Sequence, residues 1–371
     1  MSNRISDLKS IAIWTMSRFS ILLFSYMSIW ILTALEAQDL LFKDKLKAFL
    51  DLSIWNQWDV TNYISIAEKG YSISEIETNI AFFPGFPILI KLFAYLPFTF
   101  LQSAFIVTFI GGVFASIYLN KLAVREGDVN YSTLIVWVLA PMSLFLFIPY
   151  SESLFCGFSF AAWYYAKQNK WFTASLLTFF ASMIRINGIF LTIALIVMFV
   201  LNCRQNLNKI FPLFLGFVPI ISFFTYLKLK FGSWTIWFEV QEKFWQRKFT
   251  NPIISFQNSV SRALYLEYDS SWIMQNRIEI LCILLITIFL IYFFAIRAWP
   301  EFIYVFFTLF ALSTSTFWWT APRSLLSLVP IWITLGVFLE KKQLVKNLYL
   351  ILTVPLFVLN ILAFMSGRSV N

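Results

Sequence analysis

The residues best suited to chemistry lie in a polar stretch, WNQWDVTNY, at positions 55–63. It places one carboxylate, Asp59, among aromatic side chains that include Trp58 and Tyr63. A carboxylate near a hydroxyl group can take its proton as the oxygen attacks, so Asp59 is a candidate general base. If that hydroxyl group belongs to a sugar, the aromatic rings would stack on the faces of the sugar. A solvated loop acid and aromatic anchors at a membrane interface are the plainer alternatives.

Three further ionisable residues, Glu152, Arg185 and Arg323, interrupt apolar stretches. A cation at membrane depth costs about 2.5–3.5 kcal/mol on insertion scales, so each arginine is expected to have an anionic partner. Guanidinium groups bind phosphate through two parallel hydrogen bonds, which makes both arginines candidates for binding a lipid phosphate or pyrophosphate. A hairpin turn at Arg185 and a solvated or helix-capping Glu152 are the alternatives.

The segment VQEKFWQRKF, residues 240–249, has the pattern of an amphipathic interfacial helix. Helical spacing predicts that Gln241, Trp245 and Lys248 share one face of it. Packing at the interface explains this pattern simply, and contact with a substrate is the alternative. The candidates for lining a substrate pocket are Trp58, Tyr63, Glu152, Asn187, Gln241, Trp245 and Arg247.

The composition excludes a soluble domain. Hydrophobic residues make up 60% of the chain, charged residues 13%, and the mean hydropathy is +0.76. The net charge of +9 is expected to set topology and to meet lipid headgroups, not nucleic acid. With no histidine and no CxxC among three cysteines, neither a zinc site nor a disulfide framework is expected. We expect no metal and no cofactor.

About eleven apolar runs approach the length of a membrane span, which predicts an all-α integral membrane protein forming a single domain over residues 1–371. The runs are 11–34, 99–122, 131–148, 153–167, 171–184, 188–203, 210–227, 278–296, 300–317, 324–339 and 346–365.

The basic residues predict the topology, because short cytoplasmic loops are enriched in lysine and arginine. With a cytoplasmic N-terminus, the inner loops carry Lys121/Arg125, Lys167/Lys170, Arg204/Lys209, Arg297 and Lys341/Lys342/Lys346. The extracytoplasmic face then holds the long loops 35–98 and 228–277 and the turns near 149–153, 185–187 and 318–323. This requires residues 82–97 to lie on the surface, as the two prolines of AFFPGFP suggest.

Several of these segments resemble one family. The WD pair followed by YISIAEKGY and AFFPGFP is similar to PIG-V-like mannosyltransferases, the GPI mannosyltransferase 2 family of GT-C glycosyltransferases. PYSESLF, MIRINGIF, QEKFWQR and APRSLLSLVPIW follow in the family's order, so the resemblance covers residues 11 to 340. Two departures concern the acceptor: Ser324 stands where the family often has tyrosine, and the chain is shorter than the eukaryotic enzymes.

The resemblance implies a GT-C-type multi-pass helical bundle whose first extracytoplasmic loop carries interfacial helices and the catalytic acid, here Asp59. It also implies inverting transfer of a sugar, mannose above all, from a polyprenyl- or dolichyl-phosphate donor to a hydroxyl group of a glycolipid or glycan. Together with the residues, it predicts that Arg185 and Arg323 hold the donor phosphate.

Two other functions compete with this one. A multi-pass transporter or flippase for lipids or solutes predicts ionisable residues near span centres and two matching halves. A non-catalytic assembly subunit predicts no convergent acid and arginines. The compact length favours a bacterial plasma membrane over the endoplasmic reticulum.

Overall fold

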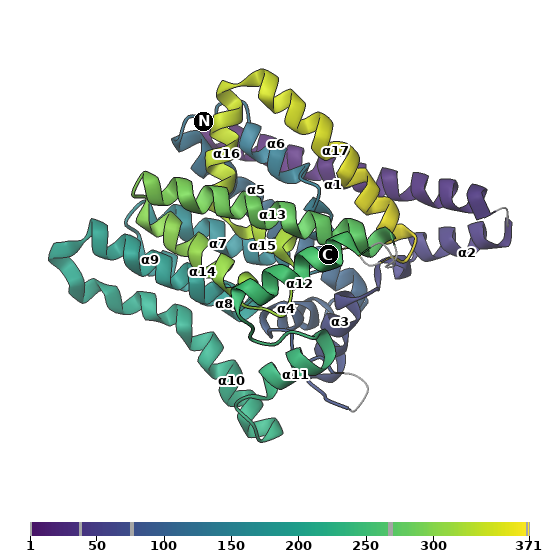
Figure 1. Ribbon diagram of the computed structural model, residues 1–371, viewed down its shortest axis with the longest axis horizontal. Helices are drawn as coiled ribbons and strands as arrows, with labels where there is room; N and C mark the ends of the chain where they lie inside the picture. The colour runs from purple at the N-terminus through teal and green to yellow at the C-terminus, as the bar shows by residue number, and fades with distance from the viewer. Residues whose placement is uncertain (1, 37–38, 75–77, 266–269, 369, 371) are drawn as a thin grey trace.

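The computed structural model describes residues 2–36, 39–74, 78–265, 270–368 and 370, and this part of the chain is helical (Figure 1). Its one β-type contact is an isolated bridge between Ile73 and Thr78. The prediction of an all-α chain is thus confirmed for the described residues. The elements are α1 (Ser2–Glu36), α2 (Asp39–Leu50), η1 (Ser53–Trp55), α3 (Asp59–Lys69), α4 (Gly85–Phe93), α5 (Phe100–Arg125), α6 (Ser132–Val138), η2 (Ser143–Leu146), α7 (Glu152–Ala166), α8 (Trp171–Ile184), α9 (Gly188–Asn202), η3 (Arg204–Phe217), α10 (Val218–Phe231), α11 (Ile236–Trp245), α12 (Pro252–Leu264), α13 (Ser270–Ala295), α14 (Trp299–Ser313), α15 (Ala321–Ser327), α16 (Val329–Lys341) and α17 (Gln343–Met365).

Helix length and composition identify a multi-pass helical membrane protein. Within the described residues, five helical segments are long and apolar enough to cross a membrane: Arg4–Ala34, Phe100–Arg125, Ile210–Phe231, Trp272–Ala295 and Gln343–Met365. The bent pair of α15 and α16 would make a sixth. All of these fall on predicted spans, but the predicted count of about eleven is not reproduced by this criterion. Three more apolar helices, α8, α9 and α14, are shorter.

One predicted span, residues 131–148, is broken in the structure. Helix α6 ends at Val138 and the next helical turn begins at Ser143, with Pro141 between them. Proline lacks an N–H group and its ring obstructs the preceding turn, so the helix cannot continue. The Arg18 guanidinium donates hydrogen bonds to the carbonyl oxygens of Ser143 and Val138, at 2.9 and 3.2 Å. These bonds give the two carbonyl groups hydrogen-bond partners, which lipid could not provide.

A second predicted span, residues 324–339, is also two helices. The axes of α15 and α16 differ by 76°, and Pro330 follows the bend. The carbonyl oxygen of Leu326 accepts a hydrogen bond from the indole of Trp137, at 3.1 Å, and so does not depend on a helical partner. The bend leaves α15 as a separate short helix that carries Arg323.

The basic connections gather at one end of the bundle. Lys121, near the end of α5, pairs with Asp7 at 3.0 Å, and Lys167, after α7, pairs with Glu126 at 3.5 Å and Glu301 at 3.4 Å. These contacts join loops that the charge pattern assigns to one face. The side chains of Arg204 and Lys209 lie outside those that the structure describes. Which end of the bundle faces the cytoplasm stays a prediction.

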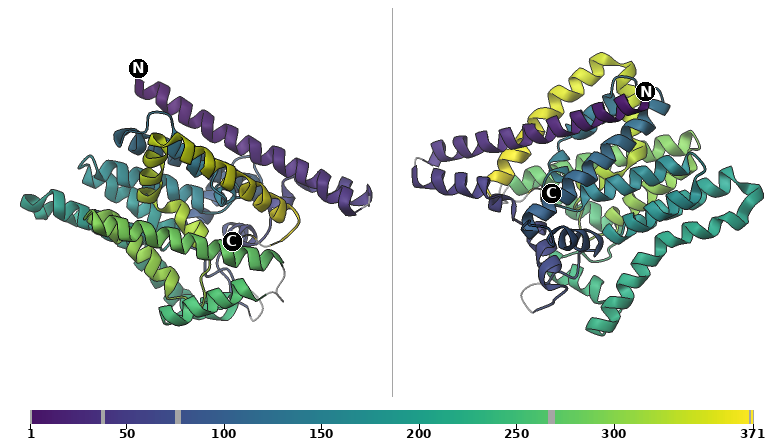
Figure 2. Two further views of the ribbon diagram at one scale, coloured as in Figure 1. Left: turned by 45° about the horizontal axis from the view of Figure 1, so that its top comes forward. Right: turned by 180° about the vertical axis from the view of Figure 1, so that it is seen from behind.

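The first long loop folds into helices at the other end. Helices α1 and α2 form a hairpin that extends beyond the rest of the bundle (Figures 1 and 2). Helix α4 has nine residues, or about 14 Å, against about 30 Å of hydrocarbon, so it cannot span a membrane. Phe86 and Ile90 are buried on one side of it, while Ile88 and Leu92 are exposed. This amphipathic helix fits the surface position predicted for residues 82–97.

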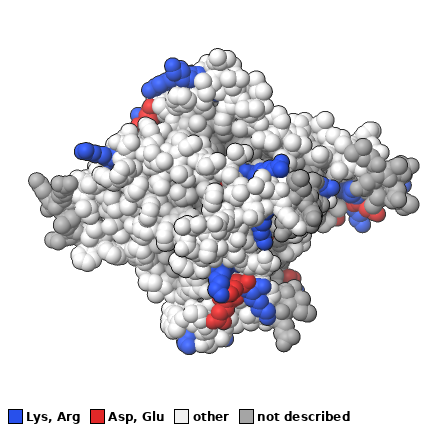
Figure 3. Space-filling view, in the orientation of Figure 1, with Lys and Arg blue, Asp and Glu red and all other residues white. Residues whose placement is uncertain are grey.

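Close packing fixes the helices that reach the site. A Cβ atom added to Gly111 of α5 would lie 2.6 Å from the Cα atom of Leu154 in α7, so only glycine permits this approach. Much of the surface suits lipid: Figure 3 shows a face that is mostly uncharged, with small groups of charged side chains, most of them near its edges, and an obvious mixed group near the lower edge. The helix bundle therefore holds α7 in close contact with α5, while much of its outer face is uncharged.

Candidate functional site

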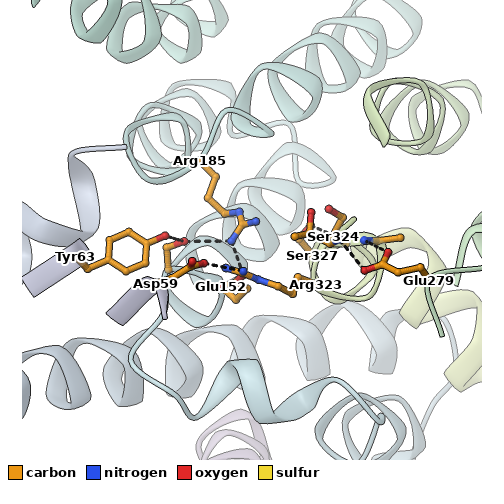
Figure 4. A network of polar contacts seen from close by, with 11 residues as sticks. Asp59, Tyr63, Glu152, Arg185, Glu279, Arg323, Ser324 and Ser327 are labelled. Atoms are coloured by element: carbon orange, nitrogen blue, oxygen red, sulfur yellow. Dashed lines mark hydrogen bonds and ion pairs between the residues drawn. The ribbon is translucent and has the colours of Figure 1, made fainter. Parts of the chain in front are cut away.

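A buried ion-pair cluster joins four segments that lie far apart in the sequence (Figure 4). Nη1 of Arg323 donates to Oδ2 of Asp59 at 2.7 Å, and its Nε is hydrogen-bonded to Oε1 of Glu152. The same Glu152 oxygen pairs with Nη1 of Arg185 at 2.6 Å. We call Asp59, Glu152, Arg185 and Arg323 the acid–arginine cluster. Its two carboxylates and two guanidiniums balance in charge, which allows their burial.

Asp59 is placed by the start of a helix. It is the first residue of α3, and Trp58 before it has φ 55° and ψ −125°, a conformation that a bulky residue rarely adopts. Such strain persists where the surroundings hold it, often at functional sites. The Asp59 side chain keeps 21% exposure, and its Oδ1 has no hydrogen-bond partner among the described residues. One carboxylate oxygen is thus anchored and the other is available.

Glu152 is part of the cluster and not a solvated or capping residue. It is the first residue of α7, its side chain is 2% exposed, and both arginines bind it. Ser151 makes no capping bond to the helix. Instead, its hydroxyl accepts hydrogen bonds from the Tyr63 hydroxyl, at 2.9 Å, and from Arg185, at 3.2 Å. Ser151, the first serine of the Ser-x-Ser pattern, therefore supports the cluster.

The AFFPGFP segment shapes one wall of the site. The Tyr63 ring packs against Phe82 and Phe86, with ring centroids 4.9 and 5.0 Å apart. A Cβ atom on Gly85 would lie 2.9 Å from the backbone of Met183, close to Arg185. Burial, together with the negative charges of Glu152 and Asp59, raises the pKa of the Tyr63 hydroxyl. Tyr63 is therefore a neutral hydrogen-bond donor and not a base.

Two aromatic residues that the sequence did not single out support Arg323. Its guanidinium lies over the Tyr150 ring, 4.7 Å from the centroid, and over the Phe145 ring, at 5.2 Å. Cation–π contacts of this kind fix a planar guanidinium without using its hydrogen-bond donors. Tyr150 lies two residues before Glu152, in the same PYSES segment. This proximity in the sequence is the feature that could have identified Tyr150 as a site residue.

A third guanidinium, that of Arg247, lies beside the cluster. In the described part of the chain no hydrogen bond or ion pair holds this guanidinium, and the residue is partly buried. Burial, followed by repulsion from Arg323, lowers the pKa of Arg247 to about 10, and the charges of Asp59 and Glu279 oppose this change. At neutral pH the group remains a cation whose donors are open to an anion.

The segment around Arg247 departs from the predicted helix. Helix α11 ends at Trp245 because Gln246 adopts the left-handed conformation, with φ 55°. The N–H of Lys248 then donates to the hydroxyl of Thr316 at 2.9 Å. The prediction that Lys248 shares a helical face with Gln241 and Trp245 is therefore wrong. The turn instead brings Arg247 toward the loop that leads to Arg323.

The other four predicted pocket residues are not part of the acid–arginine cluster. The Trp58 side chain is 47% exposed. Trp245 packs on Phe82, with centroids 5.8 Å apart, and Oε1 of Gln241 is buried without a partner among the described residues. Asn187 precedes α9 and makes no capping bond. None of these four has a recorded hydrogen bond to the acid–arginine cluster.

Sequence reasoning missed one acid, Glu279. It lies in α13, is 3% exposed, and accepts hydrogen bonds from the N–H groups of Thr320 and Ala321 (Figure 4). The sequence feature that could have identified Glu279 is an acidic residue at the edge of an apolar run. In the described part of the chain, no three histidine, cysteine, aspartate or glutamate side chains are arranged to hold a metal ion.

The helices and the cluster define a multi-pass membrane protein with a buried polar site at one end of its bundle. The chain belongs to the Mannosyltransferase (PIG-V) family, whose sequence model matches residues 11–213. This match includes Asp59, Glu152 and Arg185, and Arg323 lies beyond it.

The similar proteins are named as mannosyltransferases. The human GPI alpha-1,6-mannosyltransferase 2 is 29% identical over 147 residues, which is 36% of this chain and 29% of the human protein. The Cricetulus griseus and Rattus norvegicus proteins of that name are 29% and 28% identical over similar lengths. The match thus spans less than a third of these relatives, 29% of their length. No solved structure matches the chain.

Proposed function

We propose that the chain is a membrane mannosyltransferase with a GT-C-type bundle. It moves mannose from a polyprenyl- or dolichyl-phosphate donor to a hydroxyl group of a glycolipid or glycan, with inversion. The observation that carries this proposal is the contact of Asp59, Glu152, Arg185 and Arg323 from four distant segments. The family name and the names of the relatives support mannose as the sugar. The extracytoplasmic face and a bacterial plasma membrane remain predictions.

The chemistry follows from the two kinds of charge. Asp59 takes the proton of the acceptor hydroxyl as that oxygen forms a bond to the anomeric carbon. The bond from this carbon to the phosphate oxygen breaks, and its electron pair leaves with the phosphate. Guanidinium groups stabilise the negative charge that grows on the leaving phosphate, so no acid has to protonate it.

Arg247 refines the predicted phosphate clamp. Arg185 and Arg323 already pair with carboxylates, whereas the Arg247 guanidinium has no such partner among the described residues. The donor phosphate therefore meets Arg247 first and then shares Arg323 with Asp59. As Arg323 turns toward the phosphate, its hold on Asp59 weakens and the carboxylate becomes a better base. Donor binding in this way prepares the acid for the acceptor.

Inversion is supported by the state of Glu152. Retaining glycosidases use one carboxylate as a nucleophile on the anomeric carbon and a second one as acid and base. Glu152 is buried and bound by two guanidiniums, so it is poorly placed to be the second carboxylate beside Asp59. A single displacement with Asp59 as base needs only one available carboxylate.

The transporter alternative finds little support. It expects ionisable groups near span centres, and Arg18 of α1 is such a group. The Arg18 guanidinium, however, binds the backbone carbonyls of Ser143 and Val138 and so stabilises a helix break. Its role is accounted for without a transport pathway.

A donor panel tests the proposed function. Membranes that contain the chain, and matched membranes that lack it, receive labelled polyprenyl-phosphate mannose, polyprenyl-phosphate glucose or GDP-mannose. We expect chain-dependent transfer from polyprenyl-phosphate mannose, because the site offers guanidiniums to the donor phosphate. Chain-dependent transfer from GDP-mannose alone would overturn the lipid-phosphate donor.

Arg247 can be tested separately. Replacing it with glutamine (Arg247→Gln) removes charged hydrogen bonds to phosphate, each worth about 1.5–3 kcal/mol. We expect KM for the donor to rise at least about tenfold, with a smaller effect for Arg247→Lys. The neighbouring Lys248, whose side chain is 67% exposed, provides the control Lys248→Gln, which should leave KM unchanged. An unchanged KM in Arg247→Gln would remove this residue from the phosphate site.

A further inference from the structure

Glu279 is a buried acid that the proposed chemistry does not use. It lies within the apolar segment Trp272–Ala295, where an acid is costly unless its oxygens find partners. Oε1 accepts the N–H of Thr320 and Oε2 accepts the N–H of Ala321, both at 2.8 Å. Both oxygens are therefore bonded to the start of one short helix, α15.

Helix α15 has no capping hydrogen bond from its own capping residue. The first N–H groups of a helix have no partner within it, and a side chain at the capping position normally supplies one. Here the capping residue is Thr320, whose side chain makes no capping bond and whose φ of 68° is left-handed. A threonine in this conformation is strained unless the surroundings hold it. The Glu279 carboxylate both replaces the cap and holds the strained residue.

The helix start determines where Arg323 lies. Arg323 is the third residue of α15, and its guanidinium links Asp59 to Glu152. The preceding loop is anchored too: Trp318 N–H donates to the Ser259 hydroxyl at 2.7 Å. A shift of the first turn would therefore move the guanidinium away from both acids of the cluster.

The ionisable groups around Glu279 also connect it to the site. The buried site holds three guanidiniums, of Arg185, Arg247 and Arg323, and the carboxylates of Asp59, Glu152 and Glu279. Glu279 interacts electrostatically with both Arg247 and Arg323.

We propose that Glu279 is a positioning residue of the transfer site, which acts by capping α15 and thereby aligning Arg323 with Asp59 and Glu152. This inference rests on the proposed function, because the alignment matters for transfer. Both oxygens of Glu279 are bonded to N–H groups at the start of α15, so this role involves no contact with the sugar or the acceptor.

The first test compares variants of the full chain in membranes, with transfer from polyprenyl-phosphate mannose expressed per folded protein. Misplacement of a catalytic group by about 1 Å can reduce a rate about hundredfold, and we expect that loss in kcat/KM for Glu279→Ala. Glu279→Gln keeps one acceptor oxygen and should fall between Ala and wild type. The control Asn276→Ala removes a buried polar residue one turn away, which bonds to its own helix, and should stay within about twofold of wild type. If Glu279→Ala lowers only the yield, and the folded fraction transfers normally, the positioning role is wrong.

A second measurement does not depend on activity. Ala321 is fully buried at the start of α15, so a cysteine there (Ala321→Cys) should resist a membrane-impermeant maleimide. We expect labelling to rise when Glu279→Ala is added, because the uncapped helix start loosens. Equal protection with and without Glu279 would overturn the capping role. If the wild type transfers no mannose, the proposed function fails, and the labelling still decides whether Glu279 holds α15.

Discussion

Replacing Asp59 with asparagine (Asp59→Asn) is expected to lower the transfer rate by about 10²–10⁴-fold, the range that general-base catalysis contributes. The amide oxygen can still accept the hydrogen bond from Arg323, so the cluster should keep its shape. What is lost is the basic oxygen that would take the acceptor's proton. The measurement is mannose transfer from a labelled polyprenyl-phosphate donor, at equal amounts of folded protein.

Asp51 offers a matched control for this variant. It lies in the same loop, is exposed, and its carboxylate accepts hydrogen bonds from the hydroxyl and backbone N–H of Ser53. Asp51→Asn should therefore transfer mannose at a rate close to the wild type. If Asp59→Asn also transfers at a near-normal rate, Asp59 is not the base.

Replacing Arg323 with glutamine (Arg323→Gln) is expected to affect both stability and activity. The change leaves Asp59 without its partner and Glu152 with Arg185 alone. Breaking a buried ion pair from one side costs about 3–5 kcal/mol, because the remaining charge stays buried. We therefore expect a clearly lower unfolding temperature and little or no transfer. Heating followed by fluorescence-detected size exclusion measures the first effect.

Arg185 gives the comparison that makes this prediction specific. Arg185→Gln removes one partner of Glu152, but Arg323 still neutralises that carboxylate. The loss of stability should therefore be smaller than for Arg323→Gln, while use of the donor weakens. Arg323→Lys keeps the charge but has no planar group to bridge two acids, so activity should remain low. Equal stability of the two glutamine variants would contradict the central place of Arg323.

Much of the site's location was predictable because charge in an apolar chain is conspicuous. Arg185 and Arg323 stand out against their surroundings, and the basic loops indicated which turns share a face. The family resemblance pointed to Asp59. The pairing was not predictable: nothing in the sequence shows that Arg323 bridges both acids, because this depends on how α15 packs against α7 and brings Arg323 to Asp59 at the start of α3.

Two features that the sequence did not predict share a physical cause. Periodicity and hydropathy identify apolar runs. They do not show where a side chain, in place of another backbone group, makes the hydrogen bond to a backbone N–H or carbonyl group. The Arg18 guanidinium supports the break at Pro141, and Glu279 caps α15, each from a distant helix. Both polar residues lie inside or beside apolar runs, so the sequence alone treated them as parts of spans. Such distant caps become visible only in three dimensions.

The most direct test of the central claim uses purified protein in lipid nanodiscs. The protein is given labelled polyprenyl-phosphate mannose together with a lipid extract from its own host membranes as the source of acceptor. We predict that the wild type forms one mannosylated lipid for each polyprenyl phosphate released, and that Asp59→Asn forms neither above background. Transfer by both proteins at the same rate, or by neither while donor still binds, would contradict the account.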